Sequence, residues 1–186
     1  MVKNNLWIVK LCFWTFILAV IISIISQVIL GKVGLVTAFL LLFSIVFLGV
    51  LFDTIGVATT AAKTPPLAAK SAKKVKGAKQ ALRLVKNAEQ VATFFNDVVG
   101  DISGIISGGA ATVVVFILVN GGETQVVNVI LTSIVAAVTV GGKGIGKTLA
   151  IHNSTEILMY VGKVIYYIEK IFRVEFFTSK KNEKGK

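Results

Sequence analysis

Three charged residues interrupt long apolar stretches of this chain, and each could take part in ion chemistry. Asp53, Asp101 and Lys143 lie among apolar and small residues. An ionisable side chain inside such a stretch is costly, so it usually has a functional role, such as lining an ion path. Carboxylate oxygens are hard ligands suited to magnesium, calcium or sodium, and a lysine can neutralise a carboxylate directly.

The apolar stretches themselves predict what positions these charges. Apolar residues make up 55% of the chain and charged residues only 16%, with a mean hydropathy of +0.83. That composition is typical of membrane proteins, so we expect an all-α integral membrane protein. Four membrane-crossing helices are predicted at about 6–30, 35–62, 98–119 and 125–149.

Basic residues predict how these helices are oriented. Lysine and arginine are enriched in cytoplasmic loops, and a basic block lies between Lys63 and Lys86. Placing that block inside puts the turns at 31–34 and 120–124 outside. Both chain ends then lie in the cytoplasm, in agreement with the lysines near each end. We therefore expect a multi-pass protein of the cell membrane.

In this orientation the three charges share one depth. Asp53, Asp101 and Lys143 each lie about 18 residues from the external end of their span, which is roughly 27 Å at about 1.5 Å per residue. Asn96 and Asp97 lie slightly further toward the cytoplasm. The residues therefore form one predicted cluster in the inner leaflet. The alternative is that all are interfacial residues that reach cytoplasmic water.

Two further helices are predicted at the membrane surface. Pro65-Pro66 ends the second span, and apolar residues then recur at helical period from about 67 to 95. The remaining faces are basic, which predicts a helix or helix pair against anionic lipid headgroups, although a solvated helix would show the same pattern. A C-terminal interfacial helix is predicted at 154–177, with Asn153 as its N-cap. The residues expected to contact headgroups are Lys70, Lys73, Lys74, Lys76, Lys79, Arg83 and Lys86.

Two groups of glycines have different predicted roles. Gly100, Gly104 and Gly108 recur at four-residue spacing, which allows close helix packing in lipid. The glycines between Gly141 and Gly146 predict irregular backbone beside a wet cavity. The segment 141–148 also matches the phosphate-loop pattern GxxxxGK[ST], but the chain lacks the strand that such a loop needs. We expect no nucleotide.

Several other function classes are disfavoured by composition. The formal net charge is +11, but the lysines flank apolar runs and are not interleaved with aromatics, so lipid is expected in place of nucleic acid. The single Cys12 cannot form an internal disulfide. The single His152 has no nucleophile nearby in sequence, so we do not expect an enzyme.

From about Phe43 to Ile171 the chain resembles the transmembrane domain of the CNNM/CorC magnesium transporters. Phe52–Leu67 resembles the small-polar first helix of that family. Ala78–Glu89 resembles its A-x-x-A-L-R-L-x-x-x-x-E run, and Phe95–Gly100 resembles its G-N-x-x-x-N element. Gly142–Ala150 resembles its G-E-[IV]-x-P-K-[ST]-[LI]-A signature. The resemblance implies a homodimer that moves a divalent cation, expected to be magnesium, by alternating access.

This resemblance also implies which residues line the ion path. The path would contain Asp53, Asn96, Asp97, Asp101 and Lys143, with Asp53, Asn96 and Asp101 as metal ligands. Lys143 stands where the family has an acid, and Asp53 where it has a serine, so an Asp53–Lys143 pair and weakened magnesium binding are expected. The alternative is an accessory or scaffold membrane protein, with a partner membrane protein, in which Lys143 replaces the cation.

The predicted domain organisation has three parts. Residues 1–32 form an added N-terminal span, and residues 33–177 form the family-like transmembrane domain. Residues 178–186 form a polar tail that we expect to be disordered. We expect this protein to lack the paired regulatory module that commonly follows this domain in the family.

Overall fold

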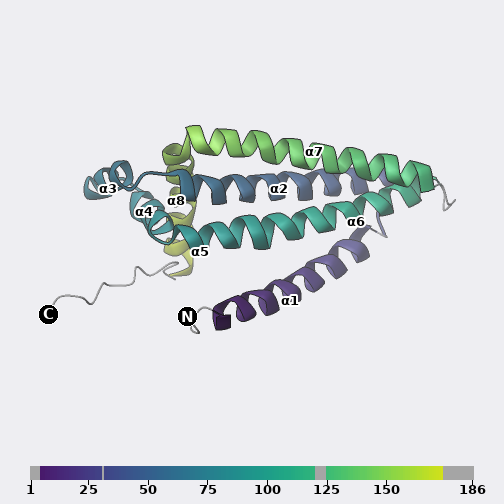
Figure 1. Cartoon of the computed structure of the whole chain (residues 1–186), viewed down its shortest axis with the longest axis horizontal. Helices are drawn as coiled ribbons and strands as arrows, with labels where there is room; N and C mark the ends of the chain where they lie inside the picture. The colour runs from purple at the N-terminus through teal and green to yellow at the C-terminus, as the bar shows by residue number, and fades with distance from the viewer. Residues whose placement is uncertain (1–4, 31, 120–124, 174–186) are drawn as a thin grey trace. The chain divides into compact units, whose positions relative to one another are not determined.

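The computed structural model describes residues 5–30, 32–119 and 125–173, and these ranges contain helices without any strand (Figure 1). Their order is α1 (Asn5–Leu30), α2 (Leu35–Ala61), α3 (Thr64–Ala72), α4 (Ala78–Lys86), α5 (Ala88–Ala92), the π-helical segment η2 (Thr93–Gly100), α6 (Asp101–Leu118), α7 (Gln125–His152) and α8 (Ser154–Phe172).

Four helices are long and apolar enough to cross a membrane, which confirms the expected all-α fold class and indicates a multi-pass membrane protein. The spans are Val9–Ile29, Leu35–Ala61, Ala88–Leu118 and Gln125–His152. The third is longer than predicted, because α5, η2 and α6 follow one another without a break. The expected surface helix at 67–95 is therefore α3 and α4, while its last residues belong to the third span.

The chain divides into two compact units. The first unit comprises the described parts of Met1–Val50 and Val98–Gly142. Its core joins α2 to α6, and α1 packs against α6 as well. At Gly49 the two backbones approach closely, since a Cβ there would lie 2.8 Å from Ser103 Cβ. The buried residues of this core are Ala38, Leu42, Val46, Val98, Ile102, Ile106, Ala110, Ala111 and Val114.

The second unit comprises the described parts of Leu51–Asp97 and Lys143–Lys186. Pro65 and Pro66 lie at the start of α3. Proline is tolerated there because the backbone N–H groups of the first turn, which proline lacks, have no acceptor within the helix. Helix α4 packs against both α3 and α8. The fully buried leucines of this core are Leu67 of α3, Leu84 of α4 and Leu158 of α8.

Two glycines allow α4 and α8 to lie close together. Gly77 precedes α4 with φ of +83°, and a Cβ there would lie 2.7 Å from the carbonyl carbon of Gly162. A Cβ at Gly162 would overlap the carbonyl oxygen of Gly77 and lie 2.9 Å from the amide nitrogen of Ala81. Any larger side chain at Gly162 would therefore push the two helices apart.

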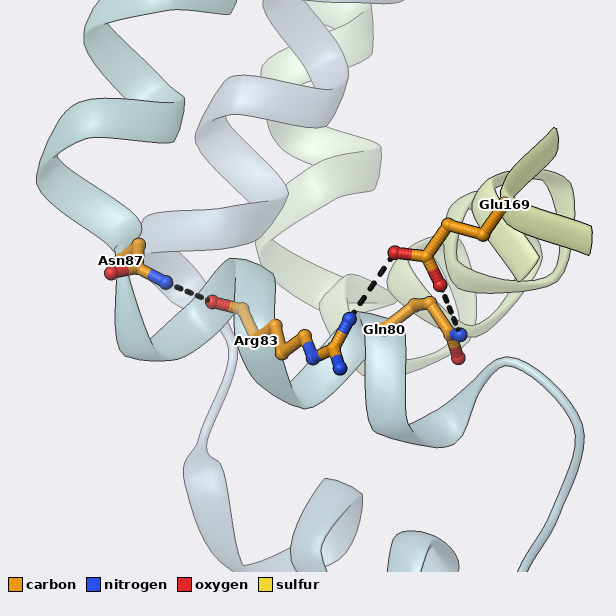
Figure 2. Close-up of polar contacts among 4 residues, drawn as sticks. All are labelled: Gln80, Arg83, Asn87 and Glu169. Atoms are coloured by element: carbon orange, nitrogen blue, oxygen red, sulfur yellow. Dashed lines mark hydrogen bonds and ion pairs between the residues drawn. The ribbon is translucent and has the colours of Figure 1, made fainter. Parts of the chain in front are cut away.

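A polar cluster reinforces this contact (Figure 2). Gln80 Nε2 donates to Glu169 Oε2 at 2.7 Å, and Arg83 Nη1 donates to Glu169 Oε1 at 3.2 Å. Asn87 Nδ2 donates to the Arg83 carbonyl at 2.9 Å, in addition to the backbone N–H of Asn87 at 3.2 Å. Arg83 is buried in this cluster, so it belongs to helix packing, and its predicted contact with headgroups is corrected.

The glycine-rich segment before α8 differs from the prediction. Residues 141–146 continue α7 as regular helix up to His152, although irregular backbone was expected. The phosphate-loop match therefore lies inside a helix, where backbone N–H groups bond to carbonyls of the preceding turn. Asn153 does separate α7 from α8, but its side chain makes no capping hydrogen bond.

Some predictions fall outside the described residues. These are the external turn at 120–124, the end of the C-terminal helix at 174–177, the tail at 178–186 and the first four residues. The structure describes Lys32 in the first turn, where it is exposed.

Candidate ion site

Asp53 lies on α2, in the second unit, and is buried. One of its two carboxylate oxygens, Oδ2, has no hydrogen-bond partner. The residue is 4% exposed. Its Oδ2 lies 3.7 Å from Nζ of Lys147 on α7, whose side chain is 51% exposed. That distance permits charge attraction but exceeds hydrogen-bond range. Asp53 Oδ2 therefore has an ion pair but no donor.

Asn96 approaches the same helix from η2. The rings of Phe95 and Phe52 stack at 5.5 Å with an interplanar angle of 11°, which fixes this part of η2 against α2. The Asn96 side chain then lies directly over Gly56, because a Cβ on Gly56 would be 2.6 Å from Asn96 Cγ. Gly56 is three residues after Asp53, so the two positions share one face of α2.

The carbonyl oxygen of Asn96 also lacks a donor. Asn96 Oδ1 and Asp53 Oδ2 are both buried without a hydrogen-bond partner. Leaving a buried acceptor unsatisfied costs about 1–3 kcal/mol, and such groups are rare in native proteins. These two acceptors come from α2 and η2 of one unit, and a cation placed close to either oxygen would stabilise it.

The local backbone at Asn96 is unusual as well. Residues 93–100 form a π-helix, in which hydrogen bonds run from i to i+5. Short π-helical segments frequently occur at functional sites, because the extra residue per turn re-aims side chains. Sequence reasoning identified Asn96 by its amide but could not locate this segment, since no residue type is diagnostic of it.

The chemistry of the two oxygens suits a hard cation. Magnesium usually takes one or two protein oxygens and keeps several waters, while calcium uses more protein ligands. Within the ranges that the structure describes, no group of three or more His, Cys, Asp or Glu side chains could hold a metal ion. The two oxygens of Asp53 and Asn96 would suit an ion that keeps most of its waters, as magnesium usually does.

The remaining predicted site residues are divided between the units. Asp97 is exposed and Lys143 half-buried in the second unit. Asp101 belongs to the first unit, where it is exposed. The expected Asp53–Lys143 pair stays a prediction.

Sequence reasoning missed two members of the site. Lys147 lies within the segments 141–148 and Gly142–Ala150, and Gly56 lies within Phe52–Leu67, but neither residue is predicted from the sequence as part of the site. Signals for both were present. Lys147 follows Lys143 by four residues and thus shares its helix face, and Gly56 lies one turn after Asp53.

The predicted packing glycines behave differently from one another. Gly100 is buried, and its carbonyl oxygen lies 3.8 Å from the position of a Cβ on Gly49. A Cβ added at Gly104 or Gly108 would meet no atom within 4 Å. These two glycines therefore have room beside them, and the expected homodimer stays a prediction.

The basic residues of α3, α4 and their connection are mostly exposed. Lys73, Lys74, Lys76, Lys79 and Lys86 are exposed and Lys70 is half-buried. Helix α8 packs one face against α4 and exposes an apolar and aromatic face. The exposed residues of α8 include Tyr160, Val164, Tyr167, Ile168, Ile171 and Phe172. Exposed lysines and an apolar helix face are the features that an interfacial position requires.

Comparison with protein-family models, curated proteins and solved structures found no match to this chain.

Proposed function

We propose that this protein transports a divalent cation, magnesium, across the membrane by way of a site formed by Asp53 and Asn96. The observation that supports the proposal is the pair of buried oxygens without donors, one on α2 and one on η2. A site of this kind attracts a cation and offers it hard ligands. Buried ionisable groups on spanning helices are in general associated with ion and substrate paths.

The resemblance to CNNM/CorC transporters gives additional support. Asn96 lies in the segment that resembles the G-N-x-x-x-N element of that family, and Asp53 lies in the segment that resembles its first helix. Both segments contribute to the site. The ion would reach it from one side and leave on the other by alternating access, with binding kept weak enough for release.

Ion flux into liposomes tests this proposal directly. The purified chain is reconstituted and flux is measured with magnesium, manganese and sodium. We expect magnesium flux in the wild type and a loss of about tenfold or more, equivalent to about 1.4 kcal/mol, in Asp53→Asn, which removes the negative charge, and in Asn96→Ala, which removes the amide oxygen. Glu89→Gln, an exposed acid on α5, is the matched control and should behave as wild type.

One observation favours a second candidate function. The ammonium group of Lys147 lies 3.7 Å from Asp53 and partly neutralises it without any metal. A protein in which a lysine permanently replaces the cation would be a non-transporting accessory subunit or scaffold. Absence of flux in all three ions, together with a stable dimer or a copurifying membrane protein, would support this candidate and contradict transport.

A further inference from the structure

The second unit contains two ion pairs of very different construction. Arg83 and Glu169 lie at 3.2 Å, and their side chains are 10% and 11% exposed. Glu169 also accepts a hydrogen bond from Gln80, so both of its oxygens have donors. This is how a permanent buried pair is stabilised, since geometry and additional hydrogen bonds offset the cost of desolvation.

The Asp53–Lys147 pair lacks each of these features. Its nitrogen and oxygen are 3.7 Å apart, outside hydrogen-bond range, and Asp53 Oδ2 has no donor. Only one partner is buried, because Asp53 is enclosed while half of the Lys147 side chain is exposed. The exposed ammonium group of Lys147 therefore partly neutralises the carboxylate without a hydrogen bond to it, so this pair does not fix the position of the ammonium group.

A flexible lysine in this position has an evident consequence for cation binding. The ammonium and a divalent ion both need the negative charge of Asp53, and repulsion between two cations about 4 Å apart is strong in a partly buried site. The ammonium group and a divalent ion therefore cannot both bind Asp53 at the same time without a large loss of affinity. The lysine is the partner able to leave, because its four-carbon stem is flexible and its head is strongly hydrated.

We propose that Lys147 is a displaceable counter-ion of Asp53, which neutralises the carboxylate when the site is empty and moves outward when a divalent cation binds. This inference rests on the proposed cation site. It also assigns a regulatory property to that site, because competition from the lysine lowers the affinity for the cation and thereby favours release.

Magnesium binding to the purified full-length chain in detergent tests the inference by titration calorimetry. Lys147→Gln removes the competing charge and should lower the magnesium Kd by about tenfold or more. Lys147→Arg should raise the Kd by about threefold or more, because a guanidinium can bond a carboxylate through two nitrogens. Lys79→Gln, an exposed lysine of α4, should leave the Kd unchanged.

The opposite changes in the two Lys147 variants keep the test decisive even if one variant does not fold. Equal or weaker magnesium binding by Lys147→Gln, or unchanged binding by Lys147→Arg, overturns the inference. If Asp53→Asn abolishes binding in the same series, the proposed cation site survives that result. Binding by Lys147→Gln alone, without binding by wild type, supports competition by the lysine. No binding by either protein overturns both proposals.

Discussion

At the scale of single residues, Gly56 determines whether Asn96 can reach α2. The asparagine side chain occupies the space where any other residue at position 56 would place its Cβ. Glycine in the middle of a helix is unfavourable by about 0.5–1 kcal/mol relative to alanine. Gly56 has this cost at a buried position directly against the unsatisfied amide oxygen of Asn96, which links Gly56 to the candidate site.

Gly56→Ala should therefore destabilise the protein and reduce cation binding together. A Cβ there would be 2.6 Å from Asn96 Cγ, so the amide or the helix must shift. We expect a loss of about 1–3 kcal/mol in stability, typical of overpacking. Gly144→Ala is the control, because a Cβ there meets nothing within 4 Å, and it should be neutral or stabilising. Equal thermal unfolding midpoints for the two variants would contradict this assignment.

The sequence was sufficient to select Asp53 and Asn96, because a carboxylate and an amide are conspicuous beside apolar helices. It was not sufficient to pair Asp53 with Lys147. Both lysines of α7 lie on one helix face, and their distance to α2 depends on packing that no single sequence displays. The same limit applies to Gly56, whose role exists only once Asn96 lies against it.

At the scale of elements, α4 and α8 are held together by close backbone packing and by a polar cluster that includes an ion pair. Gly77 and Gly162 allow the backbones to approach, and Glu169 binds Gln80 and Arg83 across the contact. The helices themselves followed from hydropathy and periodicity. Their mutual packing did not, because Arg83 has the same sequence context as the exposed lysines around it. Arg83 differs from those lysines in being buried.

Glu169→Ala tests this contact. The change leaves Arg83 and Gln80 buried beside an empty space, and hydrogen bonds to charged groups are worth about 1.5–3 kcal/mol each. We expect a stability loss of about that size in thermal unfolding. Glu156→Ala removes an exposed acid from the first turn of the same helix and should cost at most about 1 kcal/mol, through the helix dipole. A similar loss in both variants would show that the cluster adds nothing specific.

At the scale of the whole molecule, hydropathy was enough to predict four spans because apolar length is visible in sequence. The helix that contains the third candidate span begins at Ala88, earlier than the predicted start of that span at 98. The sequence predicts a surface helix that ends near 95 and a span that starts at 98, with Asn96 and Asp97 between them, whereas Val91, Phe94 and Phe95 continue the apolar character toward Ala88. In a sequence, polar residues within a long apolar helix look the same as polar residues that mark the end of a membrane-crossing segment.

The membrane orientation predicted from the basic residues can be tested by cysteine labelling. In a Cys12→Ser background, Lys32→Cys places a thiol before α2, and Lys76→Cys places one beyond α2, between α3 and α4; both residues are exposed. Because basic residues favour the cytoplasmic side, a membrane-impermeant maleimide should label Lys32→Cys in intact cells and Lys76→Cys only after the membrane is opened. The reverse pattern would invert the topology. Labelling of both thiols in intact cells would mean that α2 does not cross the membrane, and an ion path through Asp53 would then be excluded.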